Sequence, residues 1–468
     1  MANEENRSLH VVVFPWLAFG HMLPFLELSK ALARKGHRIS FITTSRNLQR
    51  LPRPPPEISD LIHFVPLPLP QVDGLPTDAE ATSDLPADRV EYLKLAFDRL
   101  ERPFRQFIQQ TSPKPDWIIQ DFAHHWVPPV AEEPVFFSIV SAGFLVFSGP
   151  PSEFPSESSS RKTPEQFTVP PPWIPFPSKL CFRLHEARRL FSDSVELNLS
   201  GVSDYQRLKL TLDGCKAVAT RSSTEVESQW LELLPKLYEK PVIPVGLLQP
   251  ETEGSGGSEG NHILHWLSKQ SSRSVVYIAF GSEATLRTEF THELARGLEL
   301  AKLPFIWALR KPSDIAADFE ELLPEGFEER TKGYGIIAKG WVPQLKILDH
   351  ESVGGFLTHC GWSSVIENFH YGHPLVLLPI FIDHGIIARI LVEKGIAVEI
   401  ERDEEDGSFT KEAVAAAVRL AVVEEEGEWM RRRAKELREV LVNKDRQGKY
   451  IDEFINYLQN HESKTSNA

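Results

Sequence analysis

Short apolar runs alternate with helical stretches along most of the chain, and this alternation limits the fold more than any other feature. The run Val-Val-Val-Phe at 11–14 suits a buried parallel strand. Apolar residues then recur at helical spacing until Gly36. Further strands are predicted over 38–43 and 116–120, the second ending at Asp121. Strands separated by helices predict a parallel sheet that is covered on both faces.

The second half of the chain repeats this pattern after a glycine- and serine-rich run at 254–258. Such runs behave as flexible linkers. We therefore predict a first domain over 1–248, a linker over 249–261, a second domain over 262–444, and a C-terminal helix at about 445–468 that packs back on the first domain. The predicted strands of the second domain cover 275–280, 305–309, 335–338, 354–357, 375–378 and 396–400. Two doubly wound α/β domains of this kind would face each other across a cleft, where ligands of open α/β sheets usually bind.

Length, charge and cysteine content exclude several classes of protein. A chain of 468 residues is too long for one core and fits two domains. The net charge of −14, from 51 basic and 65 acidic residues, argues against a nucleic-acid partner. No apolar run reaches the roughly 18 residues of a membrane span, and the N-terminus lacks the basic region of a secretory signal. Three widely spaced cysteines favour neither disulfides nor a zinc site. We therefore expect a cytoplasmic protein.

Several cofactor motifs are missing from the sequence. No Gly-x-Gly-x-x-Gly follows a strand, which removes the main support for dinucleotide binding. No Gly-x-x-x-x-Gly-Lys-Ser/Thr loop, Asp-x-Asp pair or His-Glu-x-x-His helix occurs either. A permanently bound cofactor or metal is therefore not expected.

A possible anion site lies where the strand at 354–357 gives way to a helix at 362–369. The first turn of a helix presents free amides and a partial positive charge. His359, Ser363 and Ser364 add hydrogen-bond donors at the same point. This combination predicts a site for a phosphate group.

Two further residues extend this site toward a nucleoside. Glu367 lies one helical turn further along, where its carboxylate could accept from two vicinal hydroxyls, and Trp341 offers a flat face for a base. Together with the phosphate site they describe a nucleoside diphosphate site. For any single residue a structural role is the simpler interpretation: Trp341 and Trp362 would be core residues and His359 a hydrogen-bonded buried histidine.

The 44-residue stretch 341–384 resembles the signature box of plant secondary-metabolite glycosyltransferases, glycosyltransferase family 1 with the two-domain GT-B fold. The opening at 14–21, the strand at 275–277 and the pair Gly281-Ser282 are also similar to that family. The opening and the segment 403–409 resemble the branch that adds sugar to existing glycosides. The resemblance implies a UDP-dependent glycosyltransferase with a UDP-sugar as co-substrate and a small flavonoid or terpenoid glycoside as acceptor. We expect a monomer, although the sequence does not determine the oligomeric state.

The resemblance also implies a role for each matching residue. Trp341 would stack on uracil, and the backbone of Val342 would contact its edge. The ribose would be held by Gln344 and Glu367, and the sugar hydroxyls by Asp383 and His384. The diphosphate would be bound by Ser282, His359, Ser363 and Ser364, at the start of the helix that begins with Trp362. Three departures stand out. His384 replaces the usual Gln of glucose users, which favours a rhamnose donor weakly and leaves glucose and galactose open. Ser363 replaces the usual Asn, and a loop near Ala131 is shortened, with an effect on the acceptor pocket that the sequence leaves undetermined.

His21 and Asp121 are the candidate catalytic residues. His21 follows the first strand at the start of a helix, where an imidazolium is disfavoured, so it can act as a base. Asp121 ends a strand of the same sheet and can hold the second ring nitrogen. A lone histidine after a strand is more often structural, and the match to the family favours the catalytic role. His124 and His125 fit a wall of the acceptor pocket or a surface pair equally well.

The reaction expected from these residues is an inverting, metal-independent sugar transfer to a hydroxyl group. Two alternatives remain open from the sequence. One is a sugar-nucleotide-binding protein without catalysis. The other, less favoured, is a nicotinamide oxidoreductase, which would need the glycine-rich turn that the chain lacks.

Overall fold

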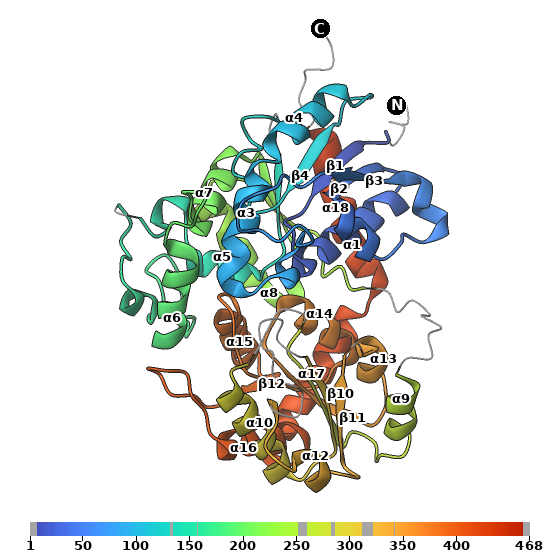
Figure 1. Ribbon diagram of the computed structural model, residues 1–468, viewed down its shortest axis with the longest axis vertical. Helices are drawn as coiled ribbons and strands as arrows, with labels where there is room; N and C mark the ends of the chain where they lie inside the picture. The colour runs from blue at the N-terminus through green and yellow to red at the C-terminus, as the bar shows by residue number, and fades with distance from the viewer. Residues whose placement is uncertain are drawn as a thin grey trace. The chain divides into compact units, whose positions relative to one another are not determined.

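The computed structural model describes residues 7–131, 134–156, 158–250, 260–281, 286–310, 322–340 and 342–461. Contacts divide the chain into two compact units. Unit 1 comprises Met1–Lys162, Phe191–Leu248 and Lys444–Ala468, and unit 2 comprises Thr163–Leu190 and Gln249–Asn443. Each unit contains one parallel β-sheet with helices packed on it, as Figure 1 shows.

The sheet of unit 1 has seven strands in the order β3-β2-β1-β4-β5-β6-β7. These strands are β1 (His10–Phe14), β2 (Arg38–Thr44), β3 (Ile62–Leu67), β4 (Trp117–Gln120), β5 (Val135–Ser138), β6 (Ala217–Thr220) and β7 (Val242–Pro244). In the middle of the sheet Val13 lies beside Phe41 of β2 and Ile119 of β4. All residues of β1 are buried, in agreement with the apolar run at residues 11–14.

Helices cover both faces of this sheet. They are α1 (Phe19–Arg34), α2 (Ser45–Arg50), α3 (Val90–Asp98), α4 (Glu101–Gln110), α5 (Ala142–Ser148), α7 (Asp204–Gly214), α8 (Thr224–Tyr238) and α18 (Lys444–Asn460). On one face α1 and α18 pack against β1, and on the other α3 and α4 do so. The C-terminal helix α18, red in Figure 1, lies beside the blue strands from the start of the chain. Trp117 Nε1 donates to the Leu458 carbonyl at 3.0 Å, which fixes α18 to β4.

The sheet of unit 2 has six strands in the order β10-β9-β8-β11-β12-β13. These strands are β8 (Val275–Ala279), β9 (Phe305–Leu309), β10 (Gly335–Lys339), β11 (Val353–Thr358), β12 (Leu375–Leu377) and β13 (Ala397–Glu399). The helices of this unit are α6 (Leu184–Leu190), α9 (Asn261–Leu267), α10 (Thr288–Ala301), α12 (Phe327–Arg330), α13 (Gln344–Leu348), α14 (Trp362–Tyr371), α15 (His384–Glu393), α16 (Lys411–Val422) and α17 (Glu428–Leu441). Residues of α10 and α16 form one apolar cluster with β8 and β9.

The stretch Thr163–Leu190 groups with unit 2, although it lies within the first 248 residues of the chain. Phe167 is fully buried, and the Phe182 amide donates to the Phe167 carbonyl at 3.0 Å. Ion pairs from Arg183 to β13 and from Glu186 of α6 to α15, described below, hold the stretch there. The domain boundaries predicted from the glycine-serine run place this stretch in the first domain. The run marks a linker in the sequence and gives no information about contacts between distant segments.

The strand order reverses between β1 and β4 in unit 1 and between β8 and β11 in unit 2. In open parallel sheets the carboxyl ends of strands at such a reversal are where ligands bind. The prediction of two doubly wound parallel-sheet units is confirmed. His21 and Asp121 follow β1 and β4, and Gly281 and His359 follow β8 and β11. Among the described residues, no helix is long and apolar enough to cross a membrane.

Candidate active site

The structure brings His21 and Asp121 together in unit 1. His21 lies in the first turn of α1, and Asp121 immediately follows β4. Their Nδ1 and Oδ2 atoms are 2.7 Å apart. The Trp16 amide also donates to Oδ2, at 3.0 Å, and the Phe122 amide donates to Oδ1 at 2.7 Å. Two backbone amides therefore fix the carboxylate that contacts the imidazole.

Asp121 is ionised in this setting. Its side chain is 2% exposed, and burial alone would raise its pKa. The pKa of Asp121 is nevertheless held below its ordinary value, because three neighbours outweigh burial. These are His21, through its charge and its hydrogen bond, the charge of His124 and the Trp16 amide. An ionised carboxylate only accepts, so Nδ1 of His21 carries the proton. In the neutral ring Nε2 is then left as the basic nitrogen, on a side chain that is 22% exposed.

His124 is not a surface residue, so the interpretation of His124 and His125 as a surface pair is wrong. His124 is fully buried between aromatic rings, with ring centroids 4.5 Å from Phe14 and 4.8 Å from Phe97. Burial lowers its pKa to about 3. His125 is half-buried and lies 3.2 Å from Nη1 of Arg207. Both follow Asp121 in the loop after β4.

In unit 2 the predicted anion site lies at the start of α14. Gly361 is the N-cap of this ten-residue helix, and Ser363 and Ser364 lie half-buried in its first turn. A Cβ at Gly361 would lie 2.6 Å from Nε2 of His359, and a Cβ at Gly281 would lie 2.9 Å from the same atom. The His359 ring therefore contacts backbone on both sides, which only glycine permits at these two positions.

His359 and His384 form a pair of buried, neutral imidazoles. Their ring centroids are 4.7 Å apart in an edge-to-face arrangement. Burial lowers the pKa of His359 to about 4. Burial, the proximity of His359 and the charge of Arg189 lower the pKa of His384 well below its ordinary value. The Phe381 amide donates to Nδ1 of His384 at 3.1 Å, so the proton of the His384 ring is on Nε2. Asp383, the N-cap of α15, has its Oδ1 3.8 Å from that Nε2.

Gln344 and Glu367 also come together, and the structure adds a residue that the sequence did not suggest. Gln344 Nε2 donates to Glu367 Oε2 at 2.6 Å. Tyr277, a fully buried residue of β8, donates from its hydroxyl to Gln344 Oε1 at 3.0 Å. Burial and the charge of Glu367 raise the pKa of Tyr277, so its hydroxyl stays a donor. In the sequence, Tyr277 has the spacing of a core strand residue and gives no signal of this role.

The remaining predicted residues have different positions. Val342 is half-buried next to the Pro343 that precedes α13. The Trp362 side chain is 3% exposed and packs on Phe369 with ring centroids 6.1 Å apart, so a ligand could contact only its backbone. Ser282 and Trp341 lie outside the described residues.

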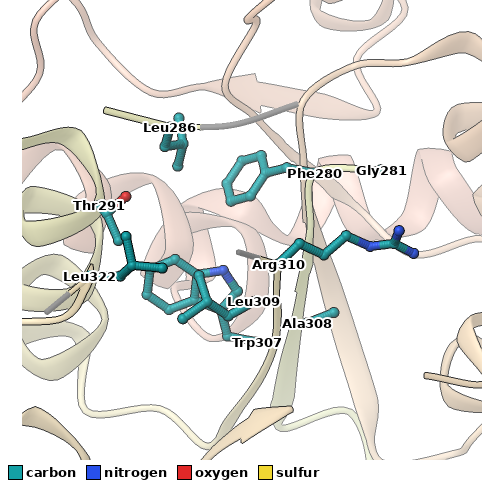
Figure 2. Close-up of a pocket in the computed structure, with 9 residues that line it drawn as sticks. All are labelled: Phe280, Gly281, Leu286, Thr291, Trp307, Ala308, Leu309, Arg310 and Leu322. Carbon is teal, nitrogen blue, oxygen red and sulfur yellow. The ribbon is translucent and has the colours of Figure 1, made fainter. Parts of the chain in front are cut away.

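A small cavity lies beside this site, at the carboxyl ends of β8 and β9. Its volume is about 30 Å³. Figure 2 shows the Trp307 ring beside Leu322 and the Arg310 side chain extending away from it. Among the described residues, no group of three or more His, Cys, Asp or Glu side chains could hold a metal ion.

Comparison with known proteins shows the family of the chain. Residues 258–445 match the family model for UDP-glucoronosyl and UDP-glucosyl transferase. The chain is 44% identical to UDP-glycosyltransferase 91C1 of Arabidopsis thaliana over 100% of both chains. It is 40% identical to soyasaponin III rhamnosyltransferase of Glycine max, over 97% of this chain and 96% of that one. The crystal structure of Arabidopsis thaliana UGT89C1 complexed with UDP-L-rhamnose is 25% identical, covers 97% of this chain and 99% of that chain, and has a TM-score of 0.72. The chain therefore belongs to the plant UDP-glycosyltransferases, enzymes that transfer sugar from a UDP-sugar co-substrate to small molecules.

Proposed function

We propose that this enzyme transfers a rhamnosyl group from UDP-rhamnose to a sugar hydroxyl of a flavonoid or terpenoid glycoside, with inversion at the anomeric carbon and without a metal ion. The observation that carries the proposal is the contact of His21 Nδ1 with Asp121 Oδ2 at 2.7 Å. A histidine held in this way by an ionised carboxylate is arranged to take a proton from a hydroxyl group.

The transfer proceeds in one displacement. His21 Nε2 takes the proton of the acceptor hydroxyl, and the acceptor oxygen forms a bond to the anomeric carbon of the donor. The bond from that carbon to the diphosphate oxygen breaks, and UDP leaves with the electron pair. The carboxylate of Asp121 stabilises the imidazolium that results. Attack opposite to the leaving group converts a β-L-rhamnosyl donor into an α-L-rhamnoside.

The start of α14 supports the departure of UDP. The first-turn amides of this helix, together with Ser363 and Ser364, offer donors to the diphosphate, whose negative charge grows as the bond breaks. The buried His359 lies beside them as a neutral donor or acceptor. Gln344 and Glu367, which contact each other, are proposed to hold the ribose. Ser282 is proposed to contact the diphosphate, and Trp341 and the Val342 backbone to contact uracil.

The choice of rhamnose rests on His384 and on the relatives. The Nδ1 atom of His384 already accepts from Phe381, so the ring can offer a sugar only its Nε2–H. An amide at this position could donate and accept at one end. Rhamnose, a 6-deoxy sugar, has one hydroxyl fewer than glucose to hydrogen-bond. This fits the smaller number of hydrogen bonds that His384 can offer. One relative is named for rhamnosyl transfer to a saponin, and one related structure holds UDP-L-rhamnose.

We further propose that the enzyme acts as a monomer in the cytoplasm, on an acceptor that already carries a sugar. The relative named for soyasaponin III supports a glycoside acceptor. Cys181, Cys215 and Cys360 are free thiols, which fits a reducing compartment.

A donor panel tests the proposal. UDP-rhamnose, UDP-glucose and UDP-galactose are each supplied at equal concentration with one flavonoid glucoside, and products are measured by mass spectrometry. We expect a rhamnosylated product to form fastest. If glucose transfer clearly exceeds rhamnose transfer, the donor assignment is wrong. If no sugar is transferred to any glycoside while UDP still binds, the chain is a nucleotide-sugar-binding protein without catalysis.

A further inference from the structure

Helix α6 comes from the first half of the chain, and buried ion pairs join it to the rest of unit 2, which contains the proposed donor site. Arg389 of α15 donates to Glu186 at 2.8 Å and to Glu399 of β13 at 3.2 Å. Arg183, just before α6, donates from Nε to the same Glu399 at 3.2 Å. The side chains of Glu186, Glu399 and Arg389 are only 9%, 10% and 12% exposed. A buried network of this kind holds its elements in one geometry, because loss of one partner leaves an uncompensated charge.

Glu186 also contacts the first turn of α15. The Arg183 amide donates to Glu186 Oε2 at 2.8 Å, which fixes the carboxylate. A Cβ at Gly385 would lie 2.5 Å from that Oε2, so the carboxylate lies against the backbone of α15. Gly385 directly follows Asp383 and His384. The position of Glu186 therefore restricts the backbone that carries these two residues.

Arg189, at the other end of α6, contacts the loop before α15. Its Nη1 donates to the carbonyl oxygen of Ile380 at 2.9 Å, and its guanidinium carbon lies 5.3 Å from the ring centroid of Phe381. The Phe381 amide donates to Nδ1 of His384, and the two rings lie 5.4 Å apart. Arg189 thus contacts Phe381, the residue whose amide makes the hydrogen bond that fixes the tautomer of His384.

We propose that α6 is part of the donor site and positions residues 380–385, so that Arg189 and Glu186 help to determine which sugar is accepted. They are positioning residues, because they act through Phe381, His384 and Gly385. This inference rests on the proposed function, in which Asp383 and His384 contact the sugar. It extends the donor site beyond the stretch 341–384 to a helix about 200 residues earlier in the chain.

Two neighbouring arginines of α6 provide a matched test. Arg188 and Arg189 are both exposed, and each donates to a backbone carbonyl, but Arg188 contacts Glu405 whereas Arg189 contacts the loop at 380–381. The variants Arg189→Ala, Arg189→Lys and Arg188→Ala are compared with the wild type. Three quantities are measured for each: the Kd of UDP by calorimetry, kcat and KM for the donor that the wild type uses fastest, and the ratio of kcat/KM between UDP-rhamnose and UDP-glucose.

For Arg189→Ala we expect kcat/KM for the preferred donor to fall about tenfold, the effect of losing one hydrogen bond from a charged donor. The ratio between the two donors should approach one, and the Kd of UDP should stay within about twofold, because UDP lacks the transferred sugar that would reach residues 383 and 384. Arg189→Lys should recover part of the loss, and Arg188→Ala should match the wild type in all three measurements.

Several results would overturn the inference. One is an unchanged donor ratio in Arg189→Ala. Another is a rise in the Kd of UDP equal to the loss in kcat/KM, which would indicate general loosening of unit 2. Glu186→Gln, which keeps the shape of the side chain, should change the donor ratio in the same direction as Arg189→Ala, and no change would also contradict the inference. A wild type that does not bind UDP would instead contradict the proposed function.

Discussion

The histidines of the two units differ in what their ring nitrogens contact. In unit 1, His21 is partly exposed and has an ionised carboxylate 2.7 Å from Nδ1. In unit 2, His359 and His384 are buried, and the nearest carboxylate oxygen described for either ring is 3.8 Å away. Burial lowers the pKa of both. A carboxylate partner stabilises the charge of a histidine that accepts a proton, whereas burial keeps the rings of His359 and His384 neutral.

The largest effect on activity is expected from a substitution at His21. His21→Ala removes the proposed base and should lower kcat by about 10²–10⁴-fold. The Kd of UDP should not change, because the proposed UDP site lies in unit 2. Single-turnover kinetics with the preferred donor measure the first quantity and calorimetry measures the second. Activity equal to that of the wild type would show that His21 is not the base.

Asp121→Asn separates the charge of the carboxylate from its shape. The Asn amide has a single oxygen, so it can accept from the Trp16 backbone amide or from the Phe122 backbone amide but not from both, and it carries no negative charge to stabilise an imidazolium. We expect kcat to fall with little change in KM for either substrate. A variant in which only the acceptor KM changes would indicate that Asp121 shapes the acceptor pocket instead.

In unit 2 the comparison can be sharpened at a glycine. Gly361→Ala places a Cβ 2.6 Å from His359 Nε2, and Gly281 limits the ring on the other side. Relief of this overpacking costs about 1–3 kcal/mol, because the His359 ring or the start of α14 must shift. Both belong to the proposed diphosphate site, so we expect the Kd of UDP to rise about tenfold or more. Gly448→Ala, in α18, is the control, because a Cβ there has no neighbour within 4 Å. The proposal for the start of α14 fails if both variants bind UDP equally well.

A smaller effect is expected at Tyr277. Tyr277→Phe leaves Gln344 Oε1 without its hydrogen bond, so the amide can rotate away from Glu367. Loss of one neutral hydrogen bond corresponds to about a two- to tenfold rise in the Kd of UDP. The rise should disappear when 2′-deoxy-UDP replaces UDP, if Gln344 and Glu367 hold the ribose hydroxyls. Tyr238→Phe, which removes a buried, hydrogen-bonded hydroxyl from unit 1, should leave both affinities unchanged.

The sequence was sufficient to predict the sheets but not the contacts between distant segments. Apolar runs such as residues 11–14 predict strands because burial on both faces leaves a local signal. His21 and Asp121 could be paired because both follow strands of one sheet. The location of α6 in unit 2 and the hydrogen bond of Tyr277 could not be predicted. Glu186 and Arg389 are 203 residues apart in the sequence, and Tyr277 and Gln344 are 67 apart, so no local pattern records either contact.

His124 in unit 1 provides a third histidine environment and the smallest predicted effect. Both of its ring nitrogens are buried without a hydrogen-bond partner, among the rings of Phe14, Phe97 and Trp126. His124→Phe replaces an unsatisfied polar ring by an apolar one of similar shape. We expect the free energy of unfolding at pH 7 to rise by about 1 kcal/mol.

The same variant should also change the dependence of stability on pH. The folded-state pKa of His124, about 3, lies below the ordinary value of 6.5. Between these values the unfolded chain binds a proton that the folded chain does not, so this histidine removes stability as the pH falls. His124→Phe should therefore make the loss of stability between pH 6.5 and 4 shallower, as measured by urea unfolding. His63→Gln, at an exposed position of β3, is the control. Equal slopes in the His124→Phe variant and the wild type would show that burial does not lower the pKa of His124 in the folded protein.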